Sequence, residues 1–239
     1  MPVDGAGLKV GSGDTPPPET ETPGAGALPD ALMLVVASCP HCPAVLASLA
    51  AMVKDGVIGR LEVVNVAVHP ELAETLGVRS LPWVRIGAFE LSGARLRAEY
   101  EQWAHRAQGG GSATGMADYF HTLLVAGALE QVRAVIERQP QRLADLLPIV
   151  ANPDASINVR IGASAVFEGL AGSAAIQALL PQLIELAAHA DQRVRADACF
   201  YLGLSRAPAA RAAVTHCLDD ADAAVREIAA DALEELKPS

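Results

Sequence analysis

The stretch Ala31-Leu-Met-Leu-Val-Val-Ala-Ser-Cys-Pro-His-Cys-Pro43 decides the fold of the first part of this 239-residue chain. Its first residues, Ala31 to Ala37, form a continuous apolar run, which predicts a strand buried on both faces. From Pro40 to Lys54 the apolar residues recur at helical spacing. Two cysteines, Cys39 and Cys42, stand where the strand gives way to the helix. A buried strand that leads directly into a helix is typical of an α/β fold.

The residues that follow extend this α/β pattern. The predicted order is strand, helix, strand, helix, strand, strand, helix. After the first strand and helix we expect a second buried strand at Leu61 to Val66, a short helix at His69 to Leu76 that ends at Gly77, a hairpin of Trp83 to Ile86 and Phe89 to Leu91, and a closing helix at Ala94 to Ala107 with Leu96, Tyr100 and Trp103 on one face.

The spacing of Cys39 and Cys42 predicts redox chemistry. With Cys39 at the N-cap of the helix, unpaired backbone N–H groups and the helix dipole favour its thiolate, which is the nucleophile. Cys42 lies one turn further on and is shielded, so it can attack the mixed disulfide that Cys39 forms. The alternatives are a zinc half-site or two inert core thiols. Zinc takes four ligands, and no second cysteine pair or histidine cluster stands at ligand spacing.

The residues around the two cysteines shape the first turn of the helix. Pro40 suits the first helical position, where no backbone donor is needed. Pro43 would delete the first intrahelical bond, so we expect a slightly distorted turn. His41, as a cation or a hydrogen-bond donor near the sulfurs, is expected to favour the Cys39 thiolate and to make the disulfide more oxidising.

The CPHC motif, together with Leu81-Pro82 directly before the third predicted strand, resembles the thioredoxin superfamily over about residues 30 to 107. The sequence is most similar to glutaredoxin-like protein disulfide oxidoreductases, and also to the N-terminal domain of alkyl hydroperoxide reductase flavoproteins. The resemblance implies a thioredoxin-like domain in which Pro82 is cis and the backbone of Leu81 pairs with substrate chains. Trp83, which follows Pro82, either lines a substrate groove or is a core strand residue.

Two positions depart from the pattern of that family. Thioredoxins carry a Trp before the first cysteine and a buried Asp six residues upstream, and here these positions hold Ser38 and Met33. The buried proton acceptor that assists the second thiol is therefore missing or supplied from elsewhere. The direction of the exchange does not follow from the motif.

Beyond residue 113 the chain is helical and repetitive. Each copy of a short template has a polar residue at the helix start, a Val-Arg pair, an Ala four residues after the Val and a large apolar residue eight residues after the Val. This pattern resembles short HEAT-like repeats, which stack as helical hairpins into a solenoid. The copies are Ser156 to Phe167, Asp191 to Leu202 and Asp222 to Leu233, with partner helices expected at Ala174 to Ala188 and Ala207 to Leu218, and with Met116 to Val150 as a fourth or capping layer.

Five residues of the repeats have two interpretations each. Arg160, Arg195 and Arg226 could form a ladder that binds an anionic partner, but we expect them to contact aspartates between repeats. Cys199 and Cys217 could be a second redox pair, but we expect buried structural cysteines because both lie in repeat cores.

Composition divides the chain into four parts. Residues 1–27, in which Gly, Pro and Thr dominate, are predicted to be a disordered tail. Residues 28–108 form the predicted thioredoxin-like domain, residues 109–113 a Gly-Gly-Gly-Ser linker segment and residues 114–239 the HEAT-like domain. The tail has no apolar segment of the kind that a secretory signal carries, so we expect a cytoplasmic protein.

The charge of the chain narrows the classes of partner. The formal net charge of -10 divides into -3 for residues 1–27, -1 for 28–113 and -6 for 114–239. Nucleic acid is an unsuitable partner because phosphate binding needs a basic face. No apolar run has the 18 or more residues of a membrane span, so no membrane partner is expected. We expect neither a cofactor nor a metal.

These observations predict a protein thiol-disulfide oxidoreductase that uses Cys39 and Cys42, supported by Pro40, His41, Leu81 and Pro82. Its partners would be a protein disulfide client, held by the HEAT-like domain, and a protein electron donor or acceptor. The alternative is a non-catalytic adaptor whose solenoid binds a partner. A third hypothesis, a lyase for bilin chromophores, leaves residues 30 to 107 unexplained.

Overall fold

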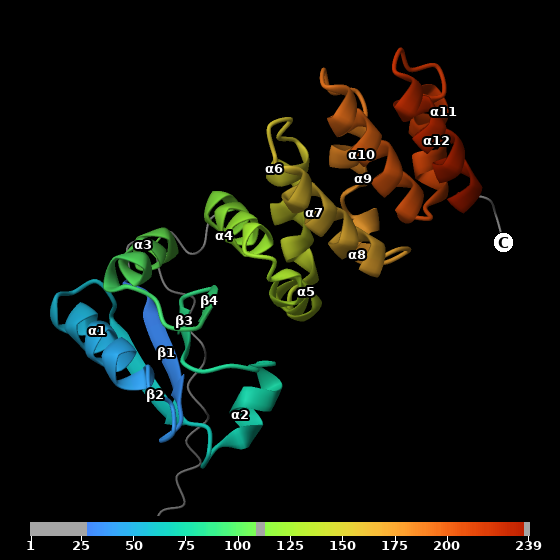
Figure 1. The fold of residues 1–239 in the computed structure, drawn as a ribbon. Helices are drawn as coiled ribbons and strands as arrows, with labels where there is room; N and C mark the ends of the chain where they lie inside the picture. The colour runs from blue at the N-terminus through green and yellow to red at the C-terminus, as the bar shows by residue number, and fades with distance from the viewer. Residues whose placement is uncertain (1–27, 109–112, 237–239) are drawn as a thin grey trace, which may run out of the picture.

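The computed structural model of the chain describes residues 28–108 and 113–236. A mixed α/β region is followed by a series of helices (Figure 1). The predicted tail at residues 1–27 and residues 109–112 of the predicted linker lie outside the described residues. In the described part of the chain, no helix is both long and apolar enough to cross a membrane.

A four-stranded sheet with the order β2-β1-β3-β4 lies at the centre of the first region. β1 runs parallel to β2 and antiparallel to β3, and β4 is antiparallel to β3. Gly87, with a φ of 56°, makes the tight turn between β3 and β4. The strands are β1 (Asp30–Val35), β2 (Arg60–Asn65), β3 (Trp83–Ile86) and β4 (Phe89–Ser92), and the helices of this region are α1 (Cys42–Lys54), α2 (Pro70–Thr75) and α3 (Arg97–Ala107).

β1 is buried on both faces, as its apolar run predicts. Ala31 and Met33 face the core formed with α1 and α3, while Leu32 and Leu34 lie in a smaller cluster under α2. The alternation follows from the pleat, because successive side chains of a strand point to opposite faces. The sheet is therefore the middle layer between two sets of helices.

Two predictions about this region are wrong. β2 is not a buried strand: Arg60, Glu62 and Val63 are exposed, because β2 lies at the edge of the sheet and, among the described strands, pairs with β1 alone. Leu96 does not share the buried face of α3 but is its N-cap and is 75% exposed, because the helix begins at Arg97.

The second region consists of HEAT-like helical repeats, stacked away from the sheet (Figure 1). Each of the three aligned sequence segments becomes a helix that begins directly after its polar residue. The expected partner helix at residues 174–188 is interrupted, because Pro181 cannot donate a backbone bond. The helices are α4 (Ala113–Val125), α5 (Leu129–Arg138), α6 (Leu147–Val150), α7 (Ile157–Gly169), α8 (Ala174–Gln177), α9 (Leu180–Leu186), α10 (Gln192–Leu204), α11 (Arg211–Cys217) and α12 (Ala223–Glu235), with 3-10 turns at Pro140–Leu146 and Pro208–Ala210.

Arginine–aspartate pairs join consecutive repeats. Arg160 of α7 donates to the Asp197 carboxylate of α10 at 2.7 Å. Arg195 of α10 donates to the Asp220 carboxylate, just before α12, at 2.7 Å. These are the expected contacts between repeats. Arg226, in the last repeat, donates instead to the backbone carbonyl of Asp220 at 2.7 Å.

Asp220 contributes an acid-sensitive part of the stability. The hydrogen bond from Arg195 holds the pKa of Asp220 below its ordinary value, which is about 3.9 for a free aspartate. The unfolded chain takes up this proton at higher pH than the folded one, so the contribution is present above the ordinary pKa and is lost as the pH falls through the lowered pKa. We expect the melting temperature of Asp220→Asn to fall less between neutral and acidic pH than that of the unmodified chain. The exposed Asp231→Asn on α12 is the control, and equal profiles for the two variants would contradict this role.

Gly203 marks a close crossing of α10 and α12. A Cβ atom there would lie 2.7 Å from the Cβ and 2.9 Å from the Cα of Ala232. At Gly162 of α7 the nearest atom, also at 2.7 Å, is the mobile tip of the Leu124 side chain. We expect Gly203→Ala to lower the free energy of unfolding by about 1–3 kcal/mol through overpacking. Gly162→Ala should cost less, because the new Cβ would meet only the end of a side chain, whereas at Gly203 it meets the backbone of Ala232. Urea denaturation measures the loss in free energy of unfolding for both variants. Equal losses would argue against a close crossing of α10 and α12 at Gly203.

Candidate functional site

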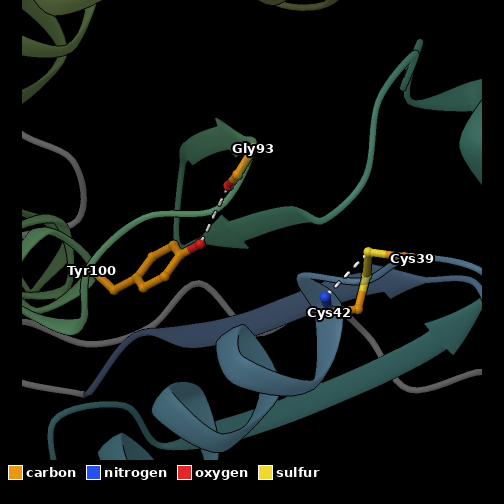
Figure 2. The surroundings of a disulfide bond; sticks show 4 residues. All are labelled: Cys39, Cys42, Gly93 and Tyr100. Atoms are coloured by element: carbon orange, nitrogen blue, oxygen red, sulfur yellow. Dashed lines mark hydrogen bonds between the residues drawn. A yellow bond between two sulfur atoms is a disulfide. The ribbon is translucent and has the colours of Figure 1, made fainter.

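Cys39 and Cys42 lie where β1 ends and α1 begins, and a disulfide joins them (Figure 2). α1 begins at Cys42 with His41 as its N-cap, so Cys39 does not cap the helix and Pro40 is not its first residue. The predicted helix start was too early because the segment before Cys42 forms turns instead of a helix. In these turns the Cys39 N–H donates to the Val36 carbonyl at 3.1 Å.

The late start of α1 also removes the expected distortion by Pro43. Pro43 is the second residue of the helix, where no backbone donor is needed. The Val45 N–H donates to the His41 carbonyl at 3.3 Å, so the first bond of the helix forms beyond the proline. Pro43 therefore fits the first turn without loss.

The two sulfurs have different surroundings. Cys42 is 5% exposed and belongs to the core beneath α1, whereas Cys39 is half-buried. The Cys42 N–H donates to the Cys39 Sγ at 3.1 Å (Figure 2). In the reduced state such a donor, at the positive end of a helix, stabilises negative charge on the sulfur. Cys39 is thus the more exposed cysteine of the pair.

The segment before β3 meets the end of β1 at the same end of the sheet. Trp83 pairs with Leu34, so Pro82 and Val35 leave the paired strands next to each other. The Leu81–Pro82 peptide bond is cis, which is the conformation that the resemblance implies. The two cysteines follow Val35 in the chain, so Pro82 and the disulfide belong to one end of the α/β region.

Gly93, directly after β4, holds Pro82 by a hydrogen bond and is itself held by α3. The Pro82 carbonyl accepts the Gly93 N–H at 2.9 Å. The Tyr100 hydroxyl donates to the Gly93 carbonyl at 3.5 Å (Figure 2). Burial raises the pKa of Tyr100, which keeps its hydroxyl protonated and able to donate. Gly93 has a φ of 81°, a conformation that glycine adopts readily.

The remaining predicted site residues take different positions. Trp83 is 2% exposed and packs with Leu32 and Leu34, so it is a core residue and does not line a groove. Leu81 is half-buried and contacts the apolar clusters on both faces of the sheet. His41 and Pro40 are exposed beside the disulfide.

The helical region contacts the sheet at β4, a contact that was not predicted from the sequence. The ring of Tyr119, from α4, lies 5.4 Å from Phe89 of β4 and 5.4 Å from Trp103 of α3, measured between centroids. The Tyr119 hydroxyl donates to the Glu90 carbonyl at 2.6 Å and accepts the Glu90 N–H at 3.1 Å. Gln131 of α5 donates to the same carbonyl at 2.7 Å. Side chains of α4 and α5 therefore occupy the outer edge of β4.

An ion pair between the buried Glu90 and the partly exposed side chain of Arg138 strengthens this contact. Arg138 of α5 donates to the Glu90 carboxylate at 2.6 Å and to the backbone carbonyl of Leu76, at the end of α2, at 3.2 Å. Burial raises the pKa of Glu90, while the positive charge of Arg138 opposes that rise. The only sequence signal was an acidic residue between Phe89 and Leu91 in an otherwise apolar strand.

Cys199 and Cys217 are buried and unbridged, in line with structural cysteines. A hydrogen bond to Cys217 and burial raise the pKa of the Cys199 thiol. A thiol that is fully enclosed and protonated is a poor nucleophile. The more exposed cysteine at the end of β1 thus remains the candidate for exchange chemistry.

Residues 180–239 match the family of HEAT repeats. The matched segment runs from α9 through α12 and includes the two Val-Arg copies that aligned best in sequence. No curated protein matches the chain. The helical C-terminal region is therefore similar to proteins built from HEAT repeats, which commonly bind other proteins.

Proposed function

We propose that this chain exchanges thiols and disulfides with a protein partner held by its helical repeats. One observation carries the proposal: the Cys39–Cys42 disulfide joins a more exposed cysteine to a shielded one at the start of a helix. Two-step exchange needs this asymmetry, because one thiolate must meet the client and the other must wait to resolve the intermediate.

In the reductive direction, both thiol–disulfide exchange steps balance when Cys39 and Cys42 start as reduced thiols. The Cys39 thiolate attacks a client disulfide, forms a mixed disulfide and releases one client thiolate. The Cys42 thiolate then attacks Cys39, restores the Cys39–Cys42 disulfide and releases the second client thiolate. Two electrons pass to the client, and a dithiol donor returns them. The oxidative direction is the reverse sequence.

The α/β region supports a thioredoxin-like fold for the proposed enzyme. The cysteine pair after β1 and the cis Leu81–Pro82 bond before β3 are features that the resemblance implies, and both adjoin the central strands of the sheet order β2-β1-β3-β4. Met33, at the position where the resemblance expects a carboxylate, is fully buried. In the proposed reaction, another group or solvent accepts the Cys42 proton.

The repeats would supply client affinity. A redox site of this kind touches a client over a small area, and a second binding surface on the same chain raises the local concentration of a client that fits both. Because the repeat region carries a net charge of -6, a client with complementary positive charge would associate faster.

The alternative function is that of an adaptor without catalysis. The match of residues 180–239 to HEAT repeats favours this function, since it supports protein binding independently of the cysteines. In an adaptor the α/β region would serve as a folded platform for the repeats. The two functions differ in whether a partner becomes covalently linked to Cys39.

Trapping with a Cys42→Ser variant separates the two functions. This variant can form the mixed disulfide through Cys39 but cannot resolve it, so we expect partners linked to it that reductant releases. The matched control is the double variant Cys39→Ser with Cys42→Ser, which has the same surface but no thiol at the site. Partners retained equally by both proteins, with none released by reductant, would support the adaptor and contradict the enzyme.

A further inference from the structure

The two edges of the sheet are treated differently. Tyr119 and Gln131 cover the outer edge of β4 with hydrogen bonds to its backbone. Among the described residues, β2 at the opposite edge pairs with no strand other than β1. An uncovered edge presents backbone donors and acceptors that can pair with another strand. Figure 1 shows β2 and α1 on the side of the sheet that faces away from the repeats.

The charges of β2 are arranged to attract a second copy of the same strand. Arg60 and Glu62 lie on one face and form an ion pair with each other at 3.0 Å, at exposed positions. Charges of one sign protect an edge because they repel a second copy. Opposite charges two residues apart do the reverse: antiparallel pairing centred on Leu61 places each Arg60 opposite the Glu62 of the other copy.

The surface of α1 beside this edge is apolar on its outer side. The charged residue of the helix is Lys54, at its end, and the Ser48 hydroxyl is bonded to the Ala44 carbonyl. A helix that is apolar all round is normally buried. Val63 adds to the apolar surface, because it pairs with Met33 and so lies on the α1 side of the sheet. Apart from Lys54, the exposed residues of α1 are Pro43, Ala44, Leu46, Ala47, Ala50 and Val53.

We propose that this face is an interface between two copies of the chain. The β2 strands pair antiparallel about a two-fold axis at Leu61, which joins the two sheets into one, and the outer faces of the α1 helices cover each other. Such an interface is isologous, since each copy presents the same strand and the same helix. The charge pattern of β2 selects a second copy over an unrelated peptide, because Arg60 and Glu62 complement themselves. This interface would form whether or not the two cysteines exchange with a client.

Sedimentation of the full chain over a dilution series tests the mass. We expect a species of twice 24.8 kDa that dissociates on dilution. A monomer at every concentration would overturn the proposal and leave the edge available to an extended segment of another protein. Far-UV circular dichroism and the melting temperature confirm that each variant described below is folded.

Charge exchange tests the register. Arg60→Glu and Glu62→Arg should each abolish the dimer, because each places like charges opposite one another at both pairs. An equimolar mixture of the two variants should restore a dimer, since each Glu then faces an Arg. A structural defect in either variant cannot be rescued by mixing. Single variants that still dimerise, or a mixture that remains monomeric, would overturn this pairing.

A charge on α1 tests the apolar part of the interface. Ala50→Glu keeps a good helix former at an exposed position but buries a carboxylate in the proposed dimer, so the dimer should be lost. Ile161→Glu on α7 is the matched control, because Ile161 is an apolar residue 60% exposed on the repeats. Loss of the dimer in the control, or its persistence in Ala50→Glu, would overturn the role of α1.

Discussion

Cys39→Ser is expected to reduce disulfide exchange by this chain to the background rate of the reductant alone. A serine hydroxyl forms neither a thiolate nor a disulfide, so the first step of the proposed reaction has no nucleophile. Cys42 cannot substitute for it, because its side chain is 5% exposed and lies in the core beneath α1. The measurement is the reduction of insulin disulfides driven by dithiothreitol.

A matched substitution elsewhere separates catalysis from a general effect of removing a thiol. Cys199→Ser removes a cysteine that is fully buried in the repeats and should leave the rate of insulin reduction unchanged. The melting temperature of both variants shows whether either has lost its fold. If Cys39→Ser retains the activity of the unmodified chain while both variants remain folded, the proposed mechanism is wrong.

The sequence predicted those parts of the fold that depend on local pattern. β1 is buried on both faces because its apolar run is continuous, and the β3–β4 hairpin turns at Gly87, between the two strands that the sequence predicts. The start of α1 was misplaced because a cysteine and two prolines allow more than one first turn. The position of His41 as N-cap is set by the turn that follows β1, which periodicity does not encode.

Long-range contacts could not be read from the sequence. The apolar residues Leu61, Val63, Val64 and Val66 favoured a buried strand, and the exposure of β2 follows from its place at the sheet edge. Trp83 is a core residue because the register with β1 turns it toward Leu32 and Leu34. The contact of Tyr119 with β4 joins residues from separate predicted regions across a glycine-rich segment, and no local pattern links them.

Tyr119→Ala should destabilise the whole described structure rather than the helical region alone. The substitution removes a buried aromatic ring that packs against Phe89 and Trp103, and such a loss costs about 3–5 kcal/mol. It also leaves the backbone N–H of Glu90 without its hydroxyl acceptor. Tyr119→Phe, which keeps the ring and deletes the hydroxyl, should cost about 1–3 kcal/mol. Urea denaturation measures both free energies.

Hydrogen exchange locates the effect and supplies its control. Tyr119→Ala should speed exchange of the β4 amides more than that of α10, since the side chain bonds directly to the edge of β4. Tyr201→Ala removes a ring stacked on Phe167 at 4.1 Å within the repeats, and should instead speed exchange in α7 and α10. If the two variants speed hydrogen exchange in the same amides, Tyr119 stabilises the chain as any buried core residue does and has no specific effect on β4. If β4 loses more protection than α10 in Tyr119→Ala, then α4 acts as part of the α/β region, and the repeats are attached to the sheet through the edge of β4.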